Sequence, residues 1–337
     1  MRQGPGAEAL LTSAQVARLR QRSNRWGMGL VLHAWTVIGL AFGAAVWWPN
    51  PLVWILSAMV IGSRQLGLLI LMHDAAHGML ARTPAVNRVL GQVFCAWPMF
   101  ADQDLYRRYH LRHHAHTLQA EDPDRVLTGH YPISRASLRR KLLRDLLGQT
   151  GFAQRRSQFA AALGSPDARL FVRLHRFLRS LGPALLANGV ILGVLSGTGH
   201  ALLYPLLWIV PALTWHQLVL RVRNIAEHAA VPDPDDPFQQ ARTTHANLWA
   251  RIFVAPYWVN YHLEHHLLMW VPCYRLPEAA QALESNGHGA RRLTSQSYLD
   301  VLRAVTTRGE GRDGESGPPR ARALGTFSDG FDAAGPT

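Results

Sequence analysis

Three short segments of the chain carry histidines at spacings typical of metal binding. One segment has two imidazoles at i and i+4, and two segments have three at i, i+3 and i+4; the residues are His73, His77, His110, His113, His114, His262, His265 and His266. On a helix these spacings place the rings on one side, about one turn apart. Imidazole is the commonest metal-binding side chain, and eight imidazoles exceed what one ion needs. The pattern predicts a metalloenzyme that holds more than one metal ion.

Two further residues extend this set. Asn224 and His228 stand at i and i+4 near the end of an apolar segment. His228 would be a ninth imidazole, and Asn224 could hold a water or a polar ligand beside it. The chain has two cysteines and no cysteine pair, which argues against a zinc ribbon or an iron–sulfur cluster. Zinc, copper and iron all accept imidazole, so ligand type alone leaves the metal open.

Acidic residues adjoin several of the histidines. Asp74, Glu227 and Glu264 each neighbour a candidate ligand, and metal-bound imidazoles usually donate their other N–H to a carboxylate or carbonyl. We expect these acids to orient imidazoles, although ordinary solvated acids are nearly as common at such positions. His116 is out of phase with the first triplet and is expected to lie just outside the ligands. The remaining histidines lack partners at useful spacing and are expected to be structural: His33, His130, His175, His200, His216, His245 and His288.

Two long uncharged runs indicate a membrane protein. No Asp, Glu, Lys or Arg occurs from Met28 to Ser63 or from Pro183 to Leu220, and each run could cross a bilayer twice at about 20 residues per crossing. The sequence therefore predicts an all-α membrane protein with four transmembrane helices in two hairpins, at about 27–48, 51–73, 183–199 and 202–222. A buried hairpin in a large soluble core is the alternative. Tryptophans near the proposed ends would anchor the helices at the interfaces: Trp47, Trp48, Trp54 and Trp208.

The placement of arginine predicts the orientation. The formal net charge is +13, and arginines crowd the two ends and the middle of the chain but avoid the expected hairpin tips. Cytoplasmic loops carry such an excess, so the histidine clusters, both termini and both cysteines, Cys95 and Cys273, are expected on the cytoplasmic side of a bacterial inner membrane, where a disulfide is improbable. This topology explains the charge without nucleic-acid binding. It gives a cytoplasmic segment (1–26), a membrane domain (27–307) with a helical cytoplasmic cap (74–182 and 223–307), and a disordered tail (308–337).

Other segments carry weaker signals. Residues 85–100 are apolar but short, which is typical of a re-entrant or interfacial segment. The stretch from Ser134 to Arg156 predicts a basic amphipathic helix that lies on an anionic membrane surface or packs on the cytoplasmic cap. An acidic turn, Glu121 to Asp124, follows the first triplet. Arg64 interrupts an apolar span and must face the protein interior or water. The basic N-terminal segment lacks the apolar core of a cleavable signal peptide.

The three histidine clusters resemble the histidine boxes of the membrane fatty acid desaturase superfamily, which includes related hydroxylases and ketolases. The resemblance covers about residues 28–280, and the phrases around His110 (Tyr106 to His114) and His262 (Asn260 to His266) are especially typical. It implies two iron ions held by the eight box histidines, with His228 as an extra ligand and Asn224 as a water-mediated one. It also implies dioxygen as co-substrate. No haem-binding His-Pro-Gly-Gly segment is present, so a separate ferredoxin, rubredoxin or cytochrome is expected to supply electrons.

Three functions remain open at this stage. A desaturase of fatty acyl chains is favoured, and a hydroxylase or ketolase of a lipid, terpenoid or small molecule would use the same site. A histidine-rich membrane metal carrier or sensor is the non-catalytic alternative. Three aromatic residues near the last cluster could line a substrate site or simply pack at the interface: Tyr257, Trp258 and Trp270.

Overall fold

Among the residues that the structure describes, three helices are long and apolar enough to cross a membrane. They are α3 (Asn24–Trp47), α4 (Pro51–Ala76) and α10 (Leu170–Gly197), with mean hydropathies of 1.8, 1.8 and 1.5 in their most apolar windows. The structure is a computed structural model that describes residues 6–307. The expected tail at 308–337 and the start of the expected N-terminal segment lie outside the described residues.

The first hairpin follows the predicted boundaries closely. Ser23 caps α3 by accepting a hydrogen bond from the Trp26 N–H at 3.3 Å. Asn50 caps α4 in the same way through the Val53 N–H at 3.0 Å, and Pro51 occupies the first turn, where its missing N–H costs nothing. α4 continues one turn beyond the predicted end at 73, so His73 lies inside the helix and His77 ends it.

The second hairpin differs from the prediction at both of its helices. α10 begins at Leu170, well before the expected position 183, and continues through Pro183. The expected helix over 202–222 is not one continuous helix. It consists of the π-helical turn η3 (Tyr204–Ile209), α11 (Val210–Leu213) and α12 (Trp215–His228), with Thr214 outside helical geometry at φ −117° and ψ −90°. Pro205 and Pro211 lack the backbone N–H that a continuous helix would need.

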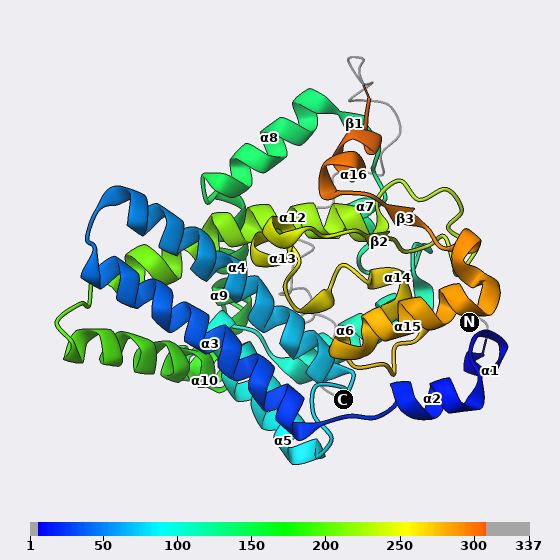
Figure 1. Ribbon diagram of the computed structural model, residues 1–337. Helices are drawn as coiled ribbons and strands as arrows, with labels where there is room; N and C mark the ends of the chain where they lie inside the picture. Colours follow the sequence, from blue (N-terminus) through cyan, green and yellow to red (C-terminus); the bar gives the residue numbers. More distant parts are fainter. Residues whose placement is uncertain (1–5, 308–337) are drawn as a thin grey trace.

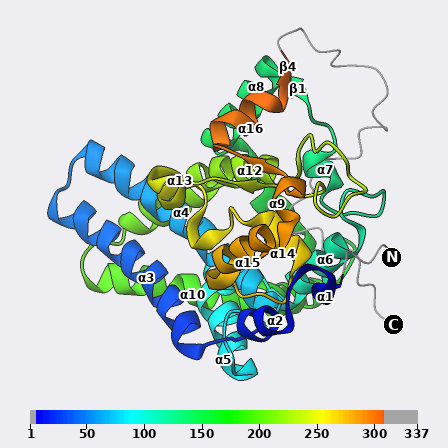
Figure 2. The ribbon, with the colours of Figure 1, turned by 45° about the vertical axis from the view of Figure 1, so that its right-hand side comes forward.

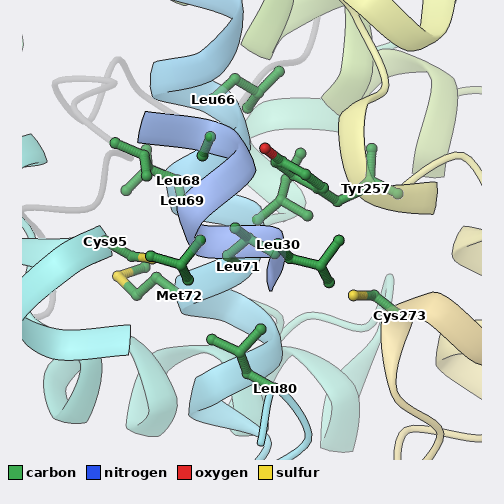
Figure 3. Packing of buried hydrophobic residues seen from close by; sticks show 14 of the residues in the cluster. Leu30, Leu66, Leu68, Leu69, Leu71, Met72, Leu80, Cys95, Tyr257 and Cys273 are labelled. Carbon is green, nitrogen blue, oxygen red and sulfur yellow. The ribbon is translucent and has the colours of Figure 1, made fainter. Parts of the chain in front are cut away.

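α4 is the central helix of the molecule (Figure 1). In its apolar window 72% of the residues are buried, against 33% in α3 and 22% in α10. Leu66, Leu68, Leu71 and Met72 of α4 are at most 1% exposed, and Figure 3 shows them among side chains from α3 and from later segments. Cys95 and Cys273 are both buried free thiols. Outer faces of α3 and α10 are left apolar and uncovered, as contact with lipid would require.

Tryptophans at the hairpin ends differ in their surroundings. Trp47 and Trp48 are 78% and 60% exposed at the α3–α4 turn, as interfacial anchors would be. Trp208 is not an anchor. It is 1% exposed, and its indole N–H donates to Asn188 Oδ1 at 3.0 Å, because the break in the second hairpin turns this ring into the core.

The remaining helices lie mostly around the end of α4 that is opposite the α3–α4 turn, as both Figure 1 and Figure 2 show. The main ones are α1 (Ala7–Leu10), α2 (Ser13–Leu19), α6 (Gln103–His116), α7 (Arg125–Thr128), α13 (Leu248–Phe253), α14 (His262–Leu267), α15 (Leu276–Leu283) and α16 (Tyr298–Ala304). Short helical turns lie between α13 and α16: η4 (Pro256–Trp258), η5 (Cys273–Arg275), η6 (Glu284–His288) and η7 (Gly289–Arg291).

The segment 85–100 is helical and packs on α4 and α3. It comprises α5 (Pro84–Val89), the π-helix η1 (Leu90–Ala96) and the 3₁₀ turn η2 (Trp97–Met99). The basic stretch is two helices rather than one, α8 (Arg135–Leu146) and α9 (Gln149–Leu163), because Gly148 adopts φ +75° between them. Leu138 of α8 is buried against α12 and α16, whereas Leu143 and Leu147 are exposed, so one face of α8 packs on the protein.

Two parallel strand pairs were not predicted from the sequence. β1 (Ile133–Ser134) pairs with β4 (Thr306–Thr307), and β2 (Thr243–Thr244) pairs with β3 (Thr294–Ser295). Each strand is only two residues long, too short to leave an alternating pattern. The pairs join the end of the described chain to the segments that follow α7 and α12.

Candidate metal centre

Four helices bring nine histidines together near one end of α4. α4 presents His73 and His77, α6 the first triplet, α12 His228 and α14 the second triplet. α6 begins where Asp102 accepts a hydrogen bond from the Leu105 N–H at 2.8 Å. α14 is only six residues long and follows a turn in which Tyr257 and Trp258 have positive φ. All nine rings are buried or half-buried.

The nine imidazoles form two groups, and each group draws on several helices. Candidate ligand atoms within each group all lie within 4.8 Å of one another. Group one consists of His73, His77, His110, His114 and His265, and group two of His113, His228, His262 and His266. Each triplet is therefore divided between the groups. The groups adjoin, since the ring centroids of His114 and His266 are 4.3 Å apart.

Several ring nitrogens within each group lie close enough together to bind one metal ion. In group one, His114 Nε2 lies 2.9 Å from His110 Nε2 and 3.0 Å from His265 Nε2. In group two, His262 Nε2 lies 2.9 Å from His228 Nε2 and 3.1 Å from His266 Nε2. Nitrogens about 2.1 Å from one ion would be about 3.0 Å apart at 90° and about 3.4 Å apart in a tetrahedron. The four distances therefore lie near those expected of imidazoles that share one ion, whereas the choice of metal is left open.

The outward nitrogens of group two have protein partners. His113 Nδ1 lies 2.8 Å from Asp122 Oδ1, and His228 Nδ1 lies 3.0 Å from the Gln240 carbonyl. His262 Nδ1 is 3.4 Å from Glu227 Oε1. An Nδ1–H that donates outward leaves Nε2 unprotonated and directed at the shared centre. Among residues 6–307, the buried Nε2 atoms of His73 and His77 in group one have no hydrogen-bond partner, as expected of nitrogens that would bind a metal.

Burial keeps most of these imidazoles neutral. It lowers the pKa of His228 to about 3, and burial with neighbouring imidazoles lowers the pKa values of His110, His114, His262, His265 and His266 well below 6.5. Burial also acts to lower the pKa of His113, but its hydrogen bond with Asp122 and the charge of Asp124 outweigh burial and raise that pKa. Neutral imidazole is the form that binds a metal, so the donor set fits metal ions.

Of the three acids expected to orient imidazoles, only Glu227 lies beside one. Glu227 also pairs with Arg223 at 2.6 Å, and burial raises its pKa to about 7 although Arg223 opposes that shift. Asp74 instead accepts the Cys273 N–H at 3.2 Å, and Glu264 accepts from Thr243 and Arg292. Both acids fix neighbouring segments, because their carboxylates face away from the rings on their own helices.

Two contacts of the group-two imidazoles were not predicted from the sequence. Asp122 is 5% exposed and also accepts the Leu118 N–H at 2.7 Å and the Asp124 N–H at 2.8 Å. Its only signal in the sequence was the acidic turn after the first triplet. The Gln240 carbonyl leaves no signal at all, because every residue has one.

A cavity of about 160 Å³ adjoins both groups. His110 of group one lines it together with His113, His228 and His262 of group two. Asn224 also lines it, one turn before His228 on α12. The cavity gives a substrate a place beside the histidines.

Other candidates have different positions. Tyr257, Trp258 and Trp270 pack in or against the hydrophobic core and do not line this cavity. Arg64 donates to the Ile252 carbonyl and lies 5.6 Å from the Tyr257 ring, so it faces the protein interior. Within residues 6–307, neither His116 nor the seven histidines expected to be structural belong to either group, although His216 lines the cavity.

Comparison with known proteins identifies the family. The sequence model for fatty acid desaturases matches residues 47–294, a range that includes all nine histidines, and the chain belongs to the fatty acid desaturase family. Dihydrorhizobitoxine desaturase of Bradyrhizobium elkanii is 28% identical over 242 residues, covering 69% of this chain and 67% of that protein. The sn-1 oleoyl-lipid 12-desaturase of Anabaena variabilis is 24% identical over 300 residues, covering 79% and 78%. The chain is therefore a desaturase-type oxidoreductase.

Proposed function

We propose that the protein is a membrane-bound desaturase that holds two iron ions, one in each histidine group, and uses dioxygen to introduce a double bond. The observation that carries this proposal is the pair of adjacent imidazole groups with ring nitrogens at metal-ligand spacing. Asn224 would contribute through a water molecule. The proposed site lies at the cytoplasmic face of a bacterial inner membrane.

Two iron ions bound there would supply the activation of dioxygen. The overall reaction consumes one O₂, two electrons and two protons, removes two hydrogens from a saturated carbon–carbon bond, and yields two waters. Asp122, Glu227 and the Gln240 carbonyl hold imidazoles in fixed orientations. We assign the electrons to a separate acidic carrier of the ferredoxin, rubredoxin or cytochrome type, because α6 exposes Arg107, Arg108 and Arg112 near the histidines.

A saturated acyl chain is the substrate class that the apolar helices support. α3, α4 and α10 would give such a chain direct access from the bilayer. One relative is named for dihydrorhizobitoxine and the other for an oleoyl lipid. Relatives of this chain are thus named for different substrates, and an acyl lipid is one of them. Hydroxylation by the same histidine groups remains the competing reaction.

Isotope labelling of the product separates these reactions. The protein is produced in a bacterial host with a ferredoxin and its reductase under ¹⁸O₂, and lipids and small metabolites are analysed by mass spectrometry. We expect a product two mass units lighter than its precursor, with no ¹⁸O. Incorporation of one ¹⁸O atom would instead establish hydroxylation. The His113→Ala protein serves as the inactive control.

Histidine substitutions test the metal assignment. His113→Ala removes an imidazole from group two and His265→Ala one from group one, so each should lower the iron content from about two ions towards one and abolish product formation. Iron is measured per protein by mass spectrometry, and retention in the membrane fraction checks insertion. His116→Ala, on the same helix as His113 but outside both groups, should keep its iron. Full iron content and activity in His113→Ala would contradict the assignment, and iron binding without any oxidation would favour a carrier or sensor.

A further inference from the structure

The cavity beside the histidines has a cationic side chain among its lining residues. Arg155 of α9 lines it together with Gln158 of the same helix and with Phe100. The Arg155 guanidinium donates to Gln158 Oε1 and lies 4.8 Å from the centre of the Phe100 ring. Gln158 is fixed in turn, because its amide donates to the Phe100 carbonyl at 2.7 Å. Arg155 is therefore held in place by neutral groups.

Arg155 differs from the other two arginines that line the cavity. Arg221 pairs with Asp145 and Arg223 with Glu227, so each of those charges is neutralised by a carboxylate. In the described part of the chain, no carboxylate lies within ion-pair distance of Arg155; its remaining acceptor is the Met99 carbonyl, at 3.5 Å. Burial lowers the pKa of Arg155 to about 10, which still leaves it charged at neutral pH. A guanidinium has five donors, and most of those on Arg155 are unused.

The charge and the histidines line the same cavity. Arg155 and His216 both line it, and the cavity-lining residues of α12 run from His216 to His228. Leu69, Leu220 and Ile225 add apolar lining to the cavity. The cavity thus combines a cation, the histidines and aliphatic side chains in its lining.

We propose that this cavity takes a substrate with a free carboxylate, which binds to Arg155 while its saturated chain extends towards the histidine groups. A guanidinium binds a carboxylate through two parallel hydrogen bonds, and an esterified acyl chain has no such group. The reaction at the chain rests on the proposed function, but carboxylate binding does not.

Direct binding measurements test the inference without any turnover. Octanoate and methyl octanoate are titrated by calorimetry into the detergent-solubilised protein, with detergent blanks. We expect octanoate to bind at least tenfold more tightly than its methyl ester. Arg155→Gln should weaken octanoate binding about tenfold to a hundredfold, because a charge-assisted pair is lost, and should leave methyl octanoate unchanged. Arg155→Lys should restore part of the affinity.

The control is Arg156→Gln, because Arg156 is the adjacent arginine on α9 but is exposed and outside the cavity lining. It should bind octanoate like the unaltered protein, and unchanged thermal unfolding shows that both variants fold. Equal affinity for acid and ester, unaltered octanoate affinity in Arg155→Gln, or tighter binding of octyl phosphate than octanoate would each overturn the proposal. An Arg155-dependent preference for octanoate in a protein that forms no double bond would uphold it and refute the proposed function instead.

Discussion

At the scale of single residues, the division of each triplet follows from helix geometry. A residue at i+4 lies about 40° around the helix axis from residue i, whereas i+3 lies about 60° away in the other direction. In α6, His110 and His114 therefore join group one while His113 joins group two. α14 mirrors this, with His265 in group one and His262 and His266 in group two. Each triplet bridges the two candidate metal positions.

Asp122→Asn tests the partner that orients His113. The amide keeps the size of the carboxylate but removes the charge that strengthens its bond to Nδ1–H, so we expect the affinity for one of the two ions to fall by about tenfold to a hundredfold. The measurement is iron retained against a graded series of chelator concentrations.

Asp104→Asn is the matched control for Asp122→Asn, since Asp104 is exposed and pairs with Arg88 at 2.8 Å. Such surface pairs contribute little, and this variant should retain both ions. If Asp122→Asn also retained them at every chelator concentration, Asp122 would have no part in holding the metal.

At the scale of elements, glycine allows α3 to approach the segment that follows α4. A Cβ at Gly27 would lie 2.3 Å from the Leu80 carbonyl oxygen, whereas a Cβ at Gly39 of the same helix would meet nothing within 4 Å. Close approach of backbones through glycine is a common way to pack helices in membranes. The contact helps to hold the chain just after His77, the last ligand candidate on α4.

Gly27→Ala should lower the stability of the protein by about 1 to 3 kcal/mol, because backbone atoms must move to admit the methyl group. We expect a lower thermal unfolding midpoint in detergent, measured by fluorescence. Gly39→Ala adds the same methyl group to open space, so its midpoint should equal or exceed that of the unaltered protein. Identical midpoints for the two variants would show that the α3 contact is not tight.

At the scale of the whole molecule, the apolar hairpins point away from the histidine groups. The α3–α4 turn and the C-terminal end of α10 lie at the same end of the molecule, as Figures 1 and 2 both show. Between residues 6 and 307, three helices qualify as spans by length and composition. A fourth crossing by η3, α11 and the first turns of α12 would return the chain to the side of the histidines.

Cysteine labelling tests this topology. Both native cysteines are buried, so an impermeant maleimide should label spheroplasts only through an introduced thiol. We expect labelling of Trp48→Cys and Leu202→Cys, at exposed positions near the two tips, and none of Val126→Cys, which is exposed at the opposite end. Labelling of Val126→Cys would reverse the proposed orientation. Labelling at 48 but not at 202 would exclude two complete hairpins.

Several of these features depend on residues that are close together in the sequence. Histidine spacing selected the eight residues of the three clusters, and His228 was found from its position at the end of an apolar segment. The first hairpin was predicted to within three residues at each helix end, because the uncharged run from Met28 to Ser63 and the break near Pro51 are local signals. Such features depend on neighbours within a turn or two of helix, so a sequence can reveal them.

The pairing of distant parts was decided only by the tertiary structure. Which imidazoles share a centre depends on how α4, α6, α12 and α14 approach one another, and that geometry follows from packing around α4 rather than from any one segment. The break at Thr214, the burial of Trp208 and the contact of Asp122 with His113 arise in the same way. The sequence by itself determined which histidines are candidate ligands. The packing of helices distant in sequence determined the groups that they form, because each group combines imidazoles from three different helices.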